Sequence, residues 1–293
     1  MNRLALLLLL LVPFLLLSQP AEADEGWVIT SFDAAYQINQ DGSVDVVEDI
    51  RVDFGAQQKH GILRDIPVDY EYDADQDGRT DSTRRIQIQV SGITDGQRSV
   101  QYVASIHGAV LNLRIGDPDV EVSGPQRYVI SYRIVGMLNA QTDPQESPSE
   151  WDEFYWNVNG NNAPVRTLSA TAEVRAPEIL KVECFQGPTG STEECESTFS
   201  DRRANFSLTD AQPEKAGLTI VVGMPKGTVE VPPPDLVGTK SFGEEFSDFV
   251  GLKPLPILAA VLAGIVSIAG VLRYWWLAGR DRWLGDLQYL SGD

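Results

Sequence analysis

The chain has 293 residues, 43% of them hydrophobic, and a formal net charge of −19 at pH 7. This acidity argues against a nucleic-acid partner and against direct adhesion to anionic lipid, because both carry negative charge. It suits a soluble surface, cation binding or a basic partner. Two histidines in the whole chain leave little room for histidine-based catalysis.

The first 23 residues have the pattern of an export signal. Arg3 supplies the positive start, Leu4 to Leu17 form the apolar core, and Ala21-Glu22-Ala23 provides the small residues that a signal peptidase reads. We expect cleavage after Ala23. The alternative is an uncleaved N-terminal anchor.

Residues 24–230 alternate apolar and polar side chains with a period of two, which is typical of half-buried strands. We expect about eleven or twelve short strands separated by turn signals, and no amphipathic helix. The pattern predicts an all-β extracytoplasmic domain, an antiparallel β-sandwich or two abutting sandwiches, with a sub-boundary near 160–165.

An acidic loop lies between the predicted opening hairpin and the next predicted strand, which begins at Ile86. Its oxygen donors occupy positions 1, 3, 5, 7 and 9 of a calcium-loop pattern, with Gly78 at position 6 for the tight turn, namely Asp73, Asp75, Asp77, Arg79 through its carbonyl, and Asp81. Position 12 is Arg84, where a bidentate Glu belongs. The two hypotheses are a calcium ion that rigidifies the loop and an acidic turn spread out in water.

The segment Asp152–Gly160 mixes acids, aromatics and amides. A hydrolase would pair Asp152 with Glu153 for acid/base work on a sugar, but neighbours in a strand point to opposite faces. A second interpretation uses Tyr155 in a carbohydrate-binding face. The favoured one places alternate residues in the core, followed by a turn. Motifs for other catalytic chemistry are lacking, so we expect a protein that is not an enzyme.

Two cysteines, Cys184 and Cys195, lie in the exported segment. An oxidising compartment and an even count favour a disulfide between them. The alternatives are two free thiols or half of a metal site. Neither histidine has ligand spacing to them, which gives the metal site no support.

The C-terminal part predicts a membrane anchor. Residues 231–253 begin with three prolines and read as a juxtamembrane stalk. Residues 254–273 contain eighteen consecutive uncharged residues, which as a helix would cover roughly 27 Å, close to the hydrocarbon thickness of a bilayer. Residues 274–293 form a short segment that starts with an aromatic belt.

Basic residues after this helix predict its orientation. Arg273, Arg280 and Arg282 cluster there, so we expect the C-terminus in the cytoplasm and the N-terminal body outside, in a single-pass membrane protein. Small residues spaced four apart in the helix would let a second copy approach closely, so self-association is a further hypothesis; they are Ala260 with Gly264 and Ala263 with Ser267.

Three stretches taken together resemble the YciQ-like family of predicted bacterial membrane proteins, the domain-of-unknown-function 2207 family. They are HGILRDIP at 60–67, DEFYWNVNG at 152–160 and the segment from Cys184 to Cys195, and the opening hairpin at 29–54 fits the same pattern. The residues that carry the resemblance in the first two stretches are His60, Gly61, Arg64, Pro67, Asp152, Glu153, Tyr155, Trp156, Asn157 and Gly160.

This resemblance implies an exported β-rich domain tethered by transmembrane helices, without an established reaction. The chain departs from the family pattern at Ala163-Pro164-Val165, where a Trp is frequent, and in the number of membrane helices. We therefore expect a membrane-anchored binding or scaffolding module at the cell envelope whose partner is an envelope protein or a glycan. The alternatives are a carbohydrate-active or other hydrolase and a calcium-stabilised structural module. No cofactor is expected apart from the candidate Ca²⁺.

Overall fold

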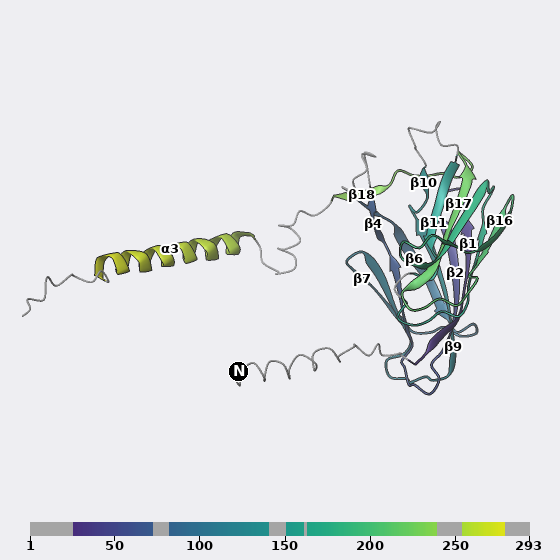
Figure 1. Ribbon diagram of the computed structural model, residues 1–293, viewed down its shortest axis with the longest axis horizontal. Helices are drawn as coiled ribbons and strands as arrows, with labels where there is room; N and C mark the ends of the chain where they lie inside the picture. Colours follow the sequence, from purple (N-terminus) through teal and green to yellow (C-terminus); the bar gives the residue numbers. More distant parts are fainter. Residues whose placement is uncertain (1–25, 73–81, 141–150, 161–162, 239–253, 279–293) are drawn as a thin grey trace, which may run out of the picture. The chain divides into compact units, whose positions relative to one another are not determined.

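The computed structural model describes residues 26–72, 82–140, 151–160, 163–238 and 254–278 (Figure 1). The chain divides into two compact units, residues 1–237 and 238–293, and each is considered by itself. The predicted signal segment at 1–23, the acidic loop at 73–81 and most of the predicted stalk lie outside the described residues. The first unit is built of strands, and the second contains one helix, α3 (Pro254–Ala278).

A seven-stranded sheet is the largest element of the first unit. Its order is β15 (Glu196–Ser200), β16 (Arg203–Ser207), β12 (Ala170–Arg175), β1 (Val28–Ile38), β2 (Val44–Asp53), β9 (Pro125–Val135) and β6 (Gln87–Thr94). β1 and β2 form the hairpin that the sequence predicts, and they are joined by a turn at Gly42. β9 and β6 continue the sheet on the far side of β2.

Three smaller sheets complete the unit. A five-stranded sheet has the order β10 (Asn139–Ala140), β11 (Trp151–Asn157), β17 (Ala216–Pro225), β13 (Lys181–Pro188) and β14 (Glu193–Glu194). One three-stranded sheet consists of β18 (Asp235–Gly238), β5 (Ser82–Arg85) and β4 (Asp69–Tyr72). The other consists of β3 (Ile62–Pro67), β8 (Val110–Ile115) and β7 (Tyr102–His107). The predicted class, mostly strands in antiparallel sheets, is confirmed.

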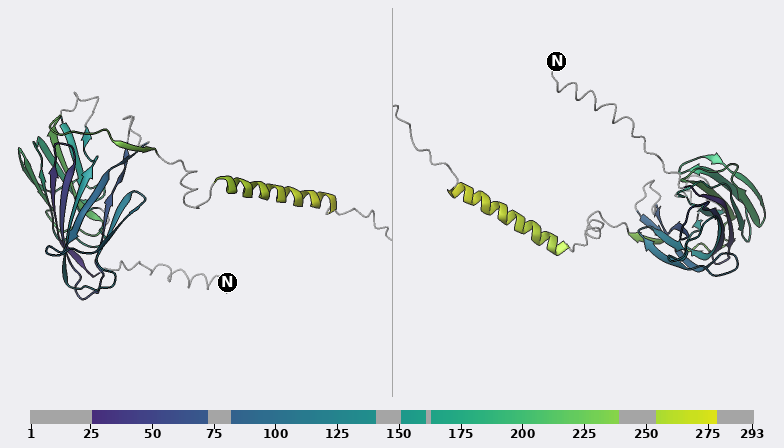
Figure 2. Two further views of the ribbon diagram at one scale, coloured as in Figure 1. Left: turned by 180° about the vertical axis from the view of Figure 1, so that it is seen from behind. Right: turned by 90° about the horizontal axis from the view of Figure 1, so that it is seen from below.

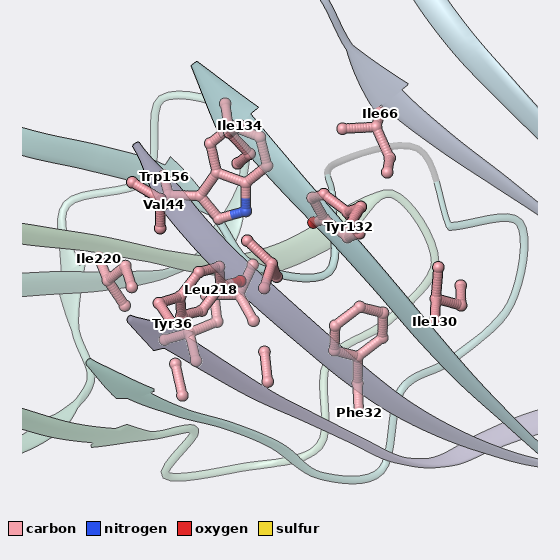
Figure 3. Packing of buried hydrophobic residues seen from close by; sticks show 14 of the residues in the cluster. Phe32, Tyr36, Val44, Ile66, Ile130, Tyr132, Ile134, Trp156, Leu218 and Ile220 are labelled. Carbon is pink, nitrogen blue, oxygen red and sulfur yellow. The ribbon is translucent and has the colours of Figure 1, made fainter. Parts of the chain in front are cut away.

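Alternation along the strands places one face of each in a shared core. Seen from below, the strands of the first unit wrap around a common interior (Figure 2). Side chains from β1, β2, β3, β9, β11 and β17 meet there in one apolar cluster (Figure 3). The Tyr36 ring of β1 lies 5.6 Å from the Phe154 ring of β11, so the seven-stranded and five-stranded sheets contribute to the same core.

The structure adds three details to the sequence interpretation. β1 and β12 run parallel, because the chain forms other strands between Ile38 and Ala170 before it returns to the edge of β1. Strands from both sides of the segment 160–165 share sheets, since β1 pairs with β12 and β11 pairs with β17. The predicted stalk contains a strand, β18, directly after its three prolines. Four residues are too few for an alternating pattern to be recognised in the sequence.

The helix predicted at 254–273 is present and extends to Ala278. Within it, the Ser267 hydroxyl donates a 2.8 Å hydrogen bond to the Ala263 carbonyl one turn earlier. Among the described residues, no helix is both long enough and apolar enough to qualify as a membrane span.

Cys184 of β13 and Cys195 are joined in a disulfide, with their Cα atoms 5.5 Å apart. Their separation of 11 residues closes a short loop that ends where edge strand β15 begins. The bond therefore ties to β13 the residue that separates β14 of the five-stranded sheet from β15 of the seven-stranded sheet.

Replacing both cysteines, Cys184→Ala with Cys195→Ala, is expected to lower the free energy of unfolding by about 3 kcal/mol, because the open loop restores conformational entropy to the unfolded chain. Chemical denaturation of both proteins, with and without reductant, measures this. Reductant should shift the wild type to the stability of the double variant and leave the variant unchanged. Equal midpoints for the oxidised and reduced wild type would contradict the prediction.

Candidate functional site

A carboxylate lies at the centre of the inner face of the seven-stranded sheet. Glu48 of β2 has no exposed surface and stands in register between Ala34 of β1 and Ile130 of β9. Its neighbours in phase along β2 are apolar and buried. Burying an unpaired carboxylate is costly, so the fold must supply a partner for Glu48.

That partner is Arg64, which projects from β3 of a different sheet. Its Nε donates to Glu48 Oε2 over 2.9 Å, and its Nη2 donates to Glu48 Oε1 over 2.7 Å. The pairing is bidentate, the geometry in which a guanidinium and a carboxylate fit best. Arg64 is only 6% exposed, so solvent screens the pair very little.

The remaining Arg64 hydrogens hold a third part of the chain. Nη2 also donates to the Val158 carbonyl over 2.9 Å, and Nη1 donates to the carbonyls of Asn159 and Asp65 over 3.3 and 3.2 Å. A guanidinium has five N–H donors, and all five of Arg64 are therefore used. Val158 and Asn159 follow β11, so one side chain connects three sheets.

The turn after β11 is shaped for this contact. Gly160 has φ of +73°, a backbone conformation that residues with a Cβ rarely adopt. A Cβ there would lie 3.2 Å from Arg64 Nη1. The Asn159 side chain fixes the same turn from the other side, since its Oδ1 accepts the Leu218 N–H over 2.8 Å.

Two aromatic groups complete the surroundings of the pair. The Tyr132 hydroxyl donates to Glu48 Oε1 over 2.7 Å, and the Arg64 guanidinium carbon lies 5.1 Å from the centre of the Phe32 ring. Burial would lower the pKa of Arg64, but the Glu48 carboxylate outweighs burial and holds that pKa above its usual value. Burial, reinforced by the Glu48 charge, raises the pKa of Tyr132 well above its usual value.

We call Glu48, Arg64, Tyr132, Val158 and Asn159 the buried clamp. Its polar groups are occupied by one another and sealed from solvent, which suits holding sheets together and not binding a substrate. Sequence reasoning assigned Arg64 to the family motif but left out Glu48 and Tyr132. The available signal was the alternation along β2, which places Glu48 on the same face as the buried Val46 and Ile50.

The clamp brings together only part of the family motif. Trp156 is buried next to the clamp turn, and the Asn157 Oδ1 atom accepts a 2.7 Å hydrogen bond from the Thr219 hydroxyl. Tyr155 points to the opposite side of β11 and is 40% exposed. Trp156 therefore supports the core, whereas Tyr155 belongs to the surface.

The other end of the motif lies around β3. His60 is exposed, with Nδ1 3.2 Å from the Val120 carbonyl oxygen. Gly61 lies so close to the Ile115 carbonyl that no Cβ would fit. Pro67 ends β3, opposite Val110 of β8. These residues shape the path of β3 and so help to place Arg64.

Asp152 and Glu153 occupy opposite faces of β11, as strand alternation predicts. Asp152 is buried, with Oδ1 3.7 Å from Lys226 Nζ and Oδ2 3.4 Å from the Gly227 nitrogen. Glu153 accepts a 3.4 Å hydrogen bond from the Asn139 side chain. The two carboxylates thus point away from each other and do not converge on one bond.

The predicted calcium ligands at 73–81 lie outside the described residues. Arg84, at the twelfth position of that loop pattern, is described: it is buried and donates 2.6 Å hydrogen bonds to the carbonyls of Gly136 and Leu138. Its side chain is therefore engaged with the backbone at 136–138. Within the described ranges, no three His, Cys, Asp or Glu side chains form a group able to hold a metal.

One accessible feature of the first unit is an open groove of about 570 Å³ on the outer face of the seven-stranded sheet. We call it the outer groove. Small or apolar side chains, among them Ala35, Val47 and Thr171, contribute to its lining. Four carboxylates also line it, whereas arginine and lysine are absent from the lining; the carboxylates are Asp33, Asp49, Glu173 and Glu196.

Arginines outside the groove contact three of these carboxylates, Asp33, Asp49 and Glu173. Glu173 Oε1 lies 2.6 Å from Arg175 Nε. Asp49 accepts two hydrogen bonds from Arg127, over 2.8 and 2.7 Å, and this interaction lowers the pKa of Asp49. Asp33 lies 3.7 Å from Arg51. Glu196 receives only a 3.4 Å hydrogen bond from the Ser207 hydroxyl. Their contacts leave part of the lone pairs of these carboxylates free for a partner.

Comparison with known proteins identifies a family. A family model described as "Predicted membrane protein (DUF2207) N-terminal domain" matches residues 28–224. No curated protein matches the chain.

Among solved structures, native leukotriene A4 hydrolase from Saccharomyces cerevisiae is 10% identical, with a TM-score of 0.40, over 70% of this chain and 31% of that chain. The M1 zinc metallopeptidase from Deinococcus radiodurans is 12% identical, with a TM-score of 0.36, over 67% of this chain and 42% of that chain. This chain thus spans less than half the length of either protein, and likeness at this level supports no conclusion about it.

Removing the cation of the clamp, Arg64→Met, is expected to cost about 3 to 5 kcal/mol of stability, because it leaves the Glu48 carboxylate buried and unpaired. Replacing both partners, Glu48→Leu with Arg64→Met, should recover most of that loss. Denaturant unfolding of the single and double variants measures the coupling.

The matched control is Arg85→Met. Arg85 makes the same bidentate contact with Asp69, at 2.7 Å for both hydrogen bonds, but its side chain is 47% exposed. Its loss should cost much less than the loss of Arg64, because solvent screens an exposed ion pair. Equal losses for the two arginine variants would show that the clamp does not carry the stability assigned to it.

Proposed function

Because this chain belongs to the DUF2207 family of predicted membrane proteins, we propose that it is a membrane-anchored extracytoplasmic β-sandwich that binds a protein partner at the bacterial cell envelope. The observation that carries the binding function is the outer groove, with its small-residue lining and four carboxylates. The buried clamp supports a non-catalytic module, since it uses Arg64 of the family motif to hold sheets together inside the fold.

The family description supports location in a membrane. For the anchor we propose the helix α3, whose run from Leu255 to Leu272 carries no charge. Basic residues at 273, 280 and 282 favour a cytoplasmic C-terminus, and the export signal favours an external body. A disulfide between Cys184 and Cys195 fits that oxidising location.

For the partner we propose an extended protein segment that carries lysine or arginine. The four carboxylates of the outer groove attract such side chains, and the small side chains between the carboxylates leave room for the backbone of the partner. The groove also reaches β15, whose five residues are all exposed and which forms the end of the seven-stranded sheet. An open strand edge offers backbone hydrogen bonds to an extended segment.

The proposed topology predicts which parts of the chain external reagents can reach. Protease added to spheroplasts should degrade the N-terminal body while a cytoplasmic marker stays intact, and green fluorescent protein fused after Asp293 should fluoresce. Immunoblots with antibody against the body give the readout. A body that resists protease until the membrane is opened would contradict this topology.

A photo-crosslinker placed in the outer groove should capture the partner. With p-benzoylphenylalanine at Val47, which is 42% exposed in the groove, we expect a protein adduct in intact cells whose linked peptide contains lysine or arginine. The control position is Val135, which is on the same sheet, is 41% exposed and lies outside the groove lining. Mass spectrometry identifies the linked peptides.

Three results would contradict the proposed partner. They are no adduct at Val47, the same adducts at Val47 and Val135, and a linked segment that is acidic or a glycan. Adding the charge reversals Asp33→Lys and Glu196→Lys should abolish the Val47 adduct if the carboxylates attract the partner.

A further inference from the structure

A second accessible site lies where the parallel strands β1 and β12 end. Gln37 of β1 is in register with Arg175 of β12, and Arg175 is in register with Arg203 of β16. Parallel neighbours release their chains at the same edge of a sheet, and loops that then diverge leave a crevice between them. Here the chain leaves β1 for the hairpin turn at Asn39, and it leaves β12 through Ala176 and Pro177.

This crevice has a volume of about 460 Å³. Its lining contains three guanidinium groups and no carboxylate, although the body around it is strongly acidic; the arginines are Arg175, Arg202 and Arg203. The other lining residues include the amides of Gln37, Asn39 and Gln40. We call this site the arginine crevice.

The arginines are only partly neutralised. Arg175 Nε lies 2.6 Å from Glu173 Oε1, and Arg203 Nε lies 3.8 Å from the same atom. Within the described part of the chain, Glu173 is the one carboxylate that contacts an arginine of the crevice, and the Arg202 side chain makes no hydrogen bond or ion pair. Three positive charges therefore share one negative charge.

We propose that the arginine crevice binds a phosphorylated sugar. Guanidinium groups recognise phosphate through paired, charge-assisted hydrogen bonds, and amides beside them suit sugar hydroxyls. The Gln40 amide is available for such bonds, and Gln37 keeps its Oε1 free, since only its Nε2 is engaged, with the Ile38 carbonyl. The volume lies in the range of small-molecule sites and exceeds that needed for a single ion.

Charge also limits the size of the ligand. Exposed charges influence one another over about 8 to 10 Å at physiological salt, so a compact ligand experiences the local arginines more than the acidic body. A long polyanion or an anionic lipid surface would meet the net negative charge of the chain. A compact phosphate monoester is therefore the ligand class that this surface favours.

This inference goes beyond the proposed function, because it concerns another surface and another class of ligand. The two sites share Glu173, which lines the outer groove and contacts Arg175 and Arg203 of the crevice. The variants that test either site leave Glu173 unchanged, so the failure of one proposal is distinguishable from the failure of the other.

Calorimetry on the full chain in neutral detergent tests the proposal, with glucose 6-phosphate as the probe and glucose, inorganic phosphate, citrate and dioctanoyl phosphatidylglycerol as comparisons. We expect glucose 6-phosphate to bind, inorganic phosphate to bind more weakly, and glucose not to bind. The variant Arg202→Gln/Arg203→Gln should weaken binding at least about tenfold, since each charge-assisted hydrogen bond is worth about a factor of ten or more.

The matched control is Arg98→Gln/Arg114→Gln, which removes the same charge from exposed positions elsewhere on the body. It should bind the probe like the wild type, and thermal unfolding should show that both double variants remain folded. The proposal is overturned if glucose 6-phosphate gives no binding, if the control variant loses as much affinity as the crevice variant, or if citrate or the lipid binds more tightly than the sugar phosphate.

Discussion

The fold of this protein depends on one buried ion pair between Glu48 and Arg64. Placing a carboxylate in the centre of an apolar sheet face is unfavourable unless a cation and further hydrogen bonds compensate for the lost hydration. Here Arg64 supplies all five of its donors, two to Glu48 and three to backbone carbonyls. The pair therefore imposes one relative placement on β2, β3 and the turn after β11, because a shift of any of them would leave a buried charge unpaired.

This constraint explains where functional surfaces are found. Three polar residues of HGILRDIP and DEFYWNVNG are buried, namely Arg64, Asp152 and Asn159. Accessible polar side chains lie instead on the outer face of the seven-stranded sheet, in rows set by its register. One row brings Asp33 and Asp49 to the outer groove, and another brings Arg175 and Arg203 to the arginine crevice.

Local patterns predicted the strands well and their distant partners poorly. A period of two requires only neighbouring residues, so the β1–β2 hairpin and the buried face of Phe154, Trp156 and Val158 follow from the sequence alone. Arg64 and the Asn159 carbonyl are 95 residues apart in the chain, and no short-range pattern encodes that contact. The parallel β1–β12 pair is hidden for the same reason, and β18 is too short for its period to be recognised.

The position of Glu48 shows how a sequence can reveal such a site without revealing its partner. The residue falls in the same phase as Val44, Val46, Ile50 and Val52, so strand alternation alone places a carboxylate in the core. A buried acid demands a cation, and Arg64 is likewise in phase with Ile62 and Ile66 on β3. In this chain the two charges, which lie on the inward faces of two strands, satisfy each other by direct contact. A charged residue among the inward-facing apolar residues of a strand therefore indicates a contact with a distant part of the chain. In this chain that contact links the opening hairpin to HGILRDIP.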